Sequence, residues 1–309
     1  MRYISDLHEG DQVSEIYLCK TKSPGTSKFG KSYYSLTLQD KTGMIDGKVW
    51  ELTNAIGHFE AMDYILVRGQ VTSYQGSNQL NIQQIRKAQE GEFDMADYMP
   101  STKKDIDGMF KELLAMISKT KNQYLKQLAE KIFIKDKNFA REFKVHSAAK
   151  SVHHGYIGGL LEHSLSVAKI CESYANLYPQ LNRDLIVMCA LWHDMGKVEE
   201  LSSFPENDYT DEGQLVGHIV MGAIKLDRLI REIPGFPPKL ANEVKHCMLA
   251  HHGELEFGSP KKPALLEAIA LSQADNLDAK METFAEIMEE TKRRSGMVRI
   301  PAFIRYKNP

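Results

Sequence analysis

The sequence predicts a multidomain protein with an all-β unit at its N-terminus and an all-α unit after it. The first 90 residues alternate short runs rich in β-branched and aromatic residues with turn-forming segments. From about residue 105, apolar residues recur at helical spacing and few strand signals interrupt them. The length of 309 residues also favours two domains.

Five runs in the first unit are predicted to be strands: 13–21, 32–39, 44–50, 64–74 and 79–85. The segment 51–60, between the third and fourth runs, has helical character. Five strands with a helix between the third and fourth are typical of an OB-fold barrel, and another small β-barrel is the alternative. We predict an OB-fold nucleic-acid-binding domain over residues 1–90.

A linker is predicted over residues 91–104, where an acidic stretch is followed by Pro100. An all-α domain is predicted over residues 105–309. Its predicted helices are 105–119, 124–134, 159–177, 184–192, 215–231, 240–251, 264–280 and 282–291.

Charge and cysteine content limit the classes of protein. The net charge is −2, so there is no global basic field, but residues 101–150 hold 12 Lys and Arg against 6 Asp and Glu. This local excess suits either a polyanion or a solvated helix face. The four cysteines form no CxxC pair and have apolar neighbours, which indicates buried free thiols in a reducing compartment. No apolar run approaches a membrane span, so we expect the cytoplasm.

Histidine is concentrated in the second unit, where nine of the eleven histidines lie between His146 and His252. Five of these nine, together with two aspartates, give seven candidate metal ligands: His163, His193, Asp194, His218, His251, His252 and Asp275. Imidazole and carboxylate suit transition metals such as Mn, Fe, Co, Ni and Zn. Seven groups are too many for one ion and suit two ions that share a carboxylate.

The pair His193-Asp194 ends an apolar helix. Adjacent side chains on a helix diverge by about 100°, so both can face one metal only near a helix end. We expect Gly196 to provide the backbone freedom that this requires. The pair at 251–252, followed by Gly253, repeats the arrangement.

A single histidine on an apolar helix is more often a hydrogen-bonded core residue than a ligand. We interpret His246 in that way, and leave out His8 and His58. His163 alone would also be interpreted as a hydrogen-bonded core residue. It belongs, however, to a series of histidines and aspartates in the order H…HD…H…HH…D. Asp275 lies in an apolar helix, where a buried carboxylate needs a cation or several hydrogen bonds.

This order in a helical domain resembles the HD superfamily of metal-dependent phosphohydrolases. The minimal ligand set of that superfamily corresponds to His163, His193, Asp194 and Asp275, and the ligands of its two-metal branch correspond to His218, His251 and His252. The run KSVHHGYIGGLLEHSLSVA at 150–168, behind an OB-like domain, is further similar to the YhaM-type 3′-to-5′ exoribonucleases of Gram-positive bacteria. This resemblance extends over essentially the whole chain.

The resemblance implies a two-metal site in which Asp194 bridges the ions. One ion is assigned to His163, His193, Asp194 and Asp275, and the other to Asp194, His218, His251 and His252. Such a pair can clamp the attacking and leaving oxygens of a phosphodiester. The family indicates manganese, although Fe, Co, Ni and Zn suit the same ligands. With Asp194, Lys197 is the second candidate catalytic residue, as a charge that neutralises a phosphate oxygen; a surface lysine at a helix C-terminus is the alternative.

Substrate contacts are expected in both units. In the loop before the first ligand, the candidates are Lys150, His153, His154 and Tyr156; alternatively, this loop simply packs on the domain surface. In the barrel, the candidates are Lys22, Lys31, Tyr33, Tyr34 and Trp50. Because alternate strand residues must fill the barrel, about half of the aromatic residues there are expected in the core.

We therefore expect a metal-dependent 3′-5′ exoribonuclease that binds single-stranded RNA, with DNA as a further candidate substrate. Cleavage polarity comes from the resemblance alone, and no residue distinguishes RNA from DNA. The alternatives are an HD-type nucleotide or cyclic-dinucleotide phosphohydrolase and a non-catalytic single-strand-binding replication factor. The helices at 105–145 have enough apolar surface for a homo-oligomer, or else pack on their own domain.

Overall fold

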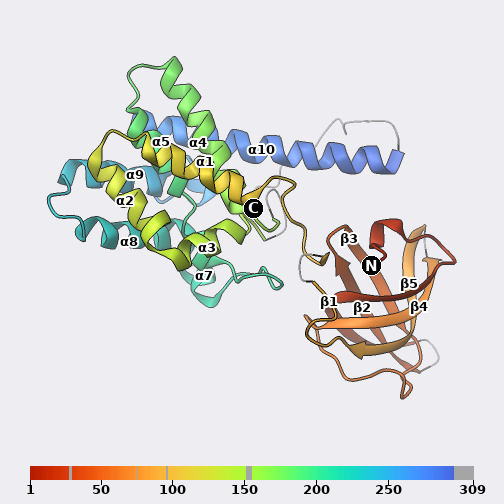
Figure 1. Ribbon diagram of the computed structural model, residues 1–309. Helices are drawn as coiled ribbons and strands as arrows, with labels where there is room; N and C mark the ends of the chain where they lie inside the picture. The colour runs from red at the N-terminus through yellow and green to blue at the C-terminus, as the bar shows by residue number, and fades with distance from the viewer. Residues whose placement is uncertain (28–29, 75, 95–96, 151–154, 296–309) are drawn as a thin grey trace. The chain divides into compact units, whose positions relative to one another are not determined.

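The structure, a computed structural model, describes residues 1–309 except 28–29, 75, 95–96, 151–154 and 296–309 (Figure 1). The chain forms two compact units, Met1–Ser101 and Thr102–Pro309. Each unit has its own hydrophobic core. The predicted order of a β unit followed by an α unit is therefore confirmed.

The first unit is a closed five-stranded barrel of the OB type. Its strands are β1 (Gln12–Thr26), β2 (Ser32–Asp40), β3 (Gly43–Val49), β4 (Tyr64–Tyr74) and β5 (Ser77–Lys87). They follow the order β1-β2-β3-β5-β4, and only the β3–β5 pair is parallel. Alternate residues such as Leu36 and Leu38 point into the core, as the period of two along a strand requires.

The prediction of a helix over residues 51–60 is wrong: these residues, all of them described, form a turn at 54–55 and an isolated bridge at Ile56, and otherwise no regular structure. Ile56 makes a parallel bridge with Ile85, and the Gly57 amide donates to the Ile85 carbonyl over 2.8 Å. Phe59 is buried in the barrel core. These contacts hold the segment against β5, and they override its local helical character.

The barrel unit extends beyond the last strand, into the predicted linker. Tyr98 and Met99 are buried, and the side chain of Gln39 donates to the Tyr98 carbonyl over 3.0 Å. The rings of Phe93 and Tyr64 stack with their centroids 4.0 Å apart. Part of the expected linker therefore packs on the barrel as far as Ser101.

An ion pair joins the same segment to β5 and gives a pH-dependent prediction. Arg86 donates two hydrogen bonds to Glu92, of 2.7 and 2.8 Å, and the Gln89 amide donates a third. The Arg86 bonds, followed by the Gln89 bond, lower the pKa of Glu92 from 4.5 to about 2. Because the folded pKa lies below the unfolded one, this pair stabilises the fold above about pH 4.5 and loses its effect as the pH falls toward 2.

Thermal unfolding of the wild type and Glu92→Gln tests this effect. The difference in melting temperature between the two proteins should narrow from about pH 6 to about pH 3. It should be small throughout, because surface ion pairs contribute little. A difference that widens as the pH falls would contradict the assignment.

The second unit is helical. Its first helices are α1 (Ile106–Ser118), α2 (Gln123–Glu130), the π-helical turn η3 (Lys131–Lys135), α3 (Lys137–Val145), α4 (Gly159–Leu177) and α5 (Arg183–Trp192). The remainder are α6 (Lys197–Glu200), α7 (Asp211–Val216), α8 (His218–Arg231), α9 (Pro238–Ala250), the short η4 (Leu255–Phe257) and α10 (Leu266–Ser295). Every residue of α5 from Asp184 to Trp192 is buried, which makes this helix the centre of the unit.

Three helical predictions differ from the structure. The helix expected over 215–231 is broken at Gly217, whose φ of 76° favours glycine, so α7 and α8 are separate. The two helices expected over 264–280 and 282–291 are one helix, α10. Helix α3 was not predicted from the sequence. All four cysteines are free and buried, as predicted. Within the described residues, no helix combines the length and apolar character needed to cross a membrane.

Candidate metal centre

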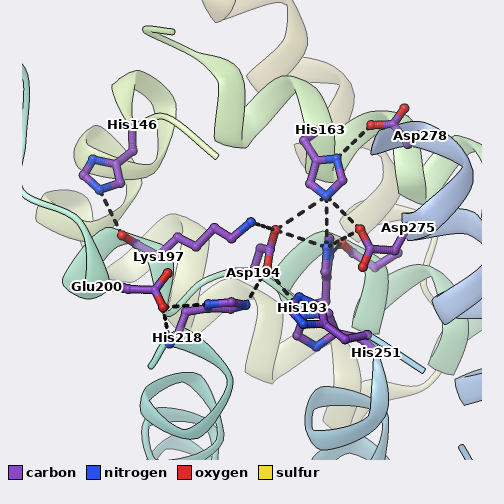
Figure 2. A network of polar contacts seen from close by, with 12 residues as sticks. His146, His163, His193, Asp194, Lys197, Glu200, His218, His251, Asp275 and Asp278 are labelled. Atoms are coloured by element: carbon purple, nitrogen blue, oxygen red, sulfur yellow. Dashed lines mark hydrogen bonds and ion pairs between the residues drawn. The ribbon is translucent and has the colours of Figure 1, made fainter. Parts of the chain in front are cut away.

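The seven predicted ligands converge on one centre in the helical unit. Figure 2 shows six of them, all except His252. They come from α4, from the turn after α5, from the first residue of α8, from the end of α9 and from α10. Their donor atoms form two groups, and within each group the atoms lie within 4.8 Å of one another. One group is His163, His193 and Asp275, and the other is Asp194, His218, His251 and His252.

The turn that carries His193 and Asp194 is held close to α8. The Met195 amide donates to the Trp192 carbonyl over 3.0 Å, so the chain turns directly after α5. Gly196 has a right-handed φ of −69°, so the expectation that it supplies unusual backbone freedom is wrong.

Gly196 is instead a point of close approach. A Cβ atom there would lie 2.1 Å from the carbonyl oxygen of His218 and 3.0 Å from the amide nitrogen of Gly222. The absent side chain lets the turn contact the start of α8, which brings Asp194 within 3.5 Å of the His218 ring. At the second pair, Gly253 does adopt a left-handed φ of 82°.

Asp194 lies between the two groups and faces both. Its Oδ2 atom is 3.5 Å from Nε2 of His163 and 3.4 Å from Nε2 of His193. Its Oδ1 atom is 3.5 Å from Nε2 of His218 and 3.5 Å from Nε2 of His251. Each carboxylate oxygen therefore faces one set of imidazoles.

All five imidazoles are held in the same way, by an acceptor at Nδ1. The pairs are His163 with Asp278 (2.7 Å), His193 with the Ala190 carbonyl (2.8 Å), His218 with Glu200 (2.9 Å), His251 with the Met248 carbonyl (2.7 Å) and His252 with the Phe257 carbonyl (2.9 Å). An Nδ1–H that donates to oxygen leaves the lone pair on Nε2. In the first four of these residues, Nε2 lies within 3.5 Å of Asp194, as a shared ligand site requires.

The polar atoms at the centre fit a divalent cation. Oδ1 of Asp194, Nε2 of His218 and Nε2 of His251 are buried without a hydrogen-bond partner among the described residues. Unsatisfied buried groups are costly, and three of them converge here. In the other group, Nε2 of His163 lies 3.2 Å from Nε2 of His193 and 3.1 Å from Oδ1 of Asp275. Donors bound about 2.0–2.2 Å from one ion have separations of this size.

The electrostatic field at the centre also favours cations. Burial alone would lower the pKa of His193, but Asp194 and Asp275 outweigh it and raise that pKa to about 10. Burial likewise opposes ionisation of Asp194, but Lys197 and His193 outweigh it and hold the pKa of this carboxyl well below its usual range. The carboxylates therefore stay ionised, and their charge favours a positive charge beside them, either a protonated imidazole or a metal ion.

Lys197 points into the centre. Its ammonium lies 2.8 Å from Oδ2 of Asp194, and the side chain is only 15% exposed. Burial acts to lower the pKa of Lys197, but Asp194 outweighs it and raises the pKa. Lys197 opens α6 and its side chain is only 15% exposed, so the alternative of a surface lysine at a helix C-terminus is wrong.

Two of the four predicted substrate residues before α4 contact other side chains. Lys150 pairs with Asp208 over 2.5 Å. The Tyr156 hydroxyl contacts Glu162 at 3.1 Å and Glu282 at 3.3 Å. His153 and His154 lie outside the described residues.

In the barrel, the predicted residues divide into two kinds. Tyr33 and Trp50 lie side by side with ring centroids 4.8 Å apart, and Trp50 is 44% exposed. Lys31, which precedes β2, is also exposed. Tyr34 is partly buried against the barrel core. Lys22 is only 15% exposed, and its ammonium donates to the Phe59 carbonyl over 2.6 Å.

Two carboxylates that hold ligands were not predicted from the sequence. Glu200 accepts from His218, and Asp278 accepts from His163. Each lies three residues after a predicted site residue, Lys197 or Asp275, and so on the same side of its helix. That spacing is a signal that could have found them.

Comparison with known proteins gives the family. The model of the HD domain family matches residues 160–280. The 3′-5′ exoribonuclease YhaM of Bacillus velezensis is 35% identical over 289 residues, which are 93% of this chain and 91% of that protein. An HD domain implies dependence on a divalent metal, in agreement with the cluster of ligands.

Two solved structures are also similar to parts of the chain. The HD domain of the phosphodiesterase PgpH from Listeria monocytogenes is 18% identical, with a TM-score of 0.32, over 50% of this chain and 80% of that one. The second OB-fold domain of replication protein A from Methanococcus maripaludis is 22% identical, with a TM-score of 0.22, over 29% of this chain and 96% of that one. On the extent of its identity with the Bacillus velezensis protein, the chain belongs to the family of YhaM-type 3′-5′ exoribonucleases.

Proposed function

We propose that this protein removes nucleotides from the 3′ end of single-stranded RNA by metal-dependent hydrolysis at the centre around Asp194. The observation that carries the proposal is the position of Asp194, with one carboxylate oxygen facing each group of ligands. The 35% identity to an exoribonuclease over 93% of the chain supports the choice of substrate.

The seven ligands would hold two ions. His163, His193 and Asp275 would bind one, His218, His251 and His252 the other, and Asp194 would bind both. When bound, two divalent ions polarise a phosphodiester, stabilise the charge on its attacking and leaving oxygens and make a water more acidic. We propose manganese as the native metal, because it suits imidazole and carboxylate ligands and is indicated by the family resemblance. The four buried free thiols support a reducing compartment, which we propose to be the cytoplasm.

Lys197 would contribute charge rather than proton transfer. Its raised pKa keeps the ammonium protonated at neutral pH, so it does not act as a base. From its position 2.8 Å from Asp194, it would orient that carboxylate and place a positive charge next to a non-bridging phosphate oxygen.

The barrel would bind the single strand through Tyr33 and Trp50. A Cβ atom at Gly25 of β1 would lie only 2.6 Å from the Tyr33 ring, so this ring covers the neighbouring strand at that point. The Lys48 ammonium lies 6.0 Å from the centroid of the same ring. An exposed tryptophan ring, with a partly exposed tyrosine ring and a lysine beside it, suits stacked bases and the phosphates that join them.

Trp50→Ala is expected to weaken RNA binding by about 1–3 kcal/mol, or from about fivefold to over a hundredfold, because it removes one stacking ring. Fluorescence anisotropy with a labelled oligoribonucleotide measures the dissociation constant. Tyr74→Ala is the matched control, since Tyr74 is 61% exposed at the end of β4. Equal affinities for the two variants would remove Trp50 from the binding surface.

The proposed activity is tested with a 5′-labelled single-stranded oligoribonucleotide and protein loaded with manganese. We expect a ladder of progressively shorter labelled products, whereas a 3′-labelled strand should lose its label in the first steps. Internal cuts would exclude an exonuclease. Turnover of mononucleotides or cyclic dinucleotides, with intact RNA, would favour the small-molecule HD hydrolases instead.

A further inference from the structure

The acceptors behind the five imidazoles are of two chemical kinds. His193, His251 and His252 donate to backbone carbonyls. His163 and His218 donate to carboxylates, and these two histidines belong to different ligand groups. Each group therefore has one charged acceptor.

We propose that Glu200 and Asp278 are positioning residues, each of which strengthens one of the two metal sites without affecting the other. Glu200 would act on the site of His218, and Asp278 on the site of His163. The inference rests on the proposed two-metal centre, and it adds the residues that determine how firmly each ion is held.

Glu200 fixes His218 at two points. Its Oε1 atom accepts from the backbone amide of His218 and from Nδ1 of the ring, each over 2.9 Å. Glu200 is itself held, because its carbonyl accepts from the Thr210 amide over 2.9 Å and a Cβ at Gly213 would lie 2.2 Å from the same oxygen. The carboxylate thus sets both the start of α8 and the direction of the imidazole.

Asp278 fixes His163 from α10. Its Oδ2 atom lies 2.7 Å from Nδ1 of His163, and its other oxygen accepts from the Ser166 hydroxyl. Asp275, one turn earlier on α10, lies 3.1 Å from Nε2 of the same ring. Helix α10 therefore presents one carboxylate to each nitrogen of His163. Asp275 faces Nε2 as a further ligand, and Asp278 accepts from Nδ1.

A carboxylate acceptor does more than a carbonyl. It fixes the tautomer in the same way, but its charge also makes the imidazole more basic and a better ligand. The centre needs this negative charge. Asp194 and Asp275 are the two anionic residues among the seven ligands, and they would face two divalent ions and the ammonium of Lys197. Glu200 and Asp278 supply two further negative charges in buried positions.

The test uses metal-free full-length protein titrated with Mn²⁺ in a calorimeter. The wild type should bind two ions. Glu200→Gln and Asp278→Asn keep the shape of the side chain and remove its charge, and each should weaken one ion by about 10–100-fold. Ser166→Ala, which leaves the carboxylate in place, should weaken the ion at His163 by less than Asp278→Asn does.

Assignment to a site comes from a His218→Ala background, in which one site is disabled. There, Glu200→Gln should have no further effect on the remaining ion, whereas Asp278→Asn should still weaken it by about 10–100-fold. Two matched controls keep both affinities: Glu199→Gln, whose carboxylate pairs with Lys225 over 2.7 Å, and Asp227→Asn, whose carboxylate pairs with Lys245 over 3.0 Å.

The inference is overturned if both affinities stay within about twofold of the wild type, or if Glu200→Gln weakens the remaining ion in the His218→Ala background. Thermal unfolding of the metal-free variants shows that the comparison is between folded proteins. The titration reads metal binding and not RNA cleavage, so a protein that binds the ions as expected but leaves RNA intact contradicts only the proposed function.

Discussion

Asp194→Asn is expected to remove both metal ions and to lower the rate of RNA hydrolysis by at least about 10³-fold, or about 4 kcal/mol of transition-state stabilisation. Asp194 is the one predicted ligand that faces both groups, with each oxygen 3.4–3.5 Å from the imidazoles of one group. An amide has a single oxygen and no charge, so it cannot replace the carboxylate at both sites. The measurements are kcat/KM on a labelled oligoribonucleotide and the metal content of the purified variant.

The same substitution should also lower stability, because it leaves the buried ammonium of Lys197 without its partner at 2.8 Å. Activity must therefore be compared at a temperature where the variant is folded, as circular dichroism can establish. Asp227→Asn controls for the loss of an aspartate elsewhere in the unit. A folded Asp194→Asn protein that retained two ions or wild-type cleavage would refute the assignment of Asp194 as the shared ligand.

Gly196→Ala is expected to lower activity by about 10²-fold, although this residue has no side chain and is not one of the predicted ligands. Its new Cβ would lie 2.1 Å from the His218 carbonyl oxygen, so the turn and α8 must separate by at least about 1.3 Å to reach the 3.4 Å of ordinary contact. That shift moves Asp194 and His218 apart. Overpacking should also cost about 1–3 kcal/mol of unfolding free energy.

Steady-state kinetics and chemical denaturation measure the two effects of Gly196→Ala. Gly108→Ala on α1 is the control, because the three atoms nearest to a Cβ there all belong to the side chain of Asp105, the closest at 2.8 Å, and none is backbone. We expect this control to keep full activity and to be at least as stable as the wild type, since alanine favours a helix. Wild-type activity in Gly196→Ala would mean that the contact between the turn and α8 does not set the geometry of the centre.

Much of the site was predictable because its signal is local in the sequence. The order of histidines and aspartates identified seven side chains that the fold does bring together. The apolar periodicity likewise predicted α4 at its observed bounds, Gly159–Leu177. Both signals survive folding because they depend on residue type and spacing alone.

The remainder depends on contacts between distant segments. The expected helix over 51–60 is replaced by pairing of Ile56 with Ile85, which no local pattern announces. Lys22 resembles a solvent-facing phosphate contact in the sequence, but it donates to the Phe59 carbonyl instead.

The same limit applies to the outer residues of the site. Glu200 looks like one of two surface glutamates in the run KVEE, and only the fold shows that it faces His218. The role of Gly196 was misjudged in the same way, because close approach to α8 cannot be seen in the sequence.

Metal content tests the central claim most directly. Elemental analysis of protein purified without chelator should give two equivalents of a divalent transition metal per wild-type chain, with neither ion retained in Asp194→Asn. A single equivalent in the wild type would contradict the two-metal centre. His218, His251 and His252 would then have to act as contacts to the substrate.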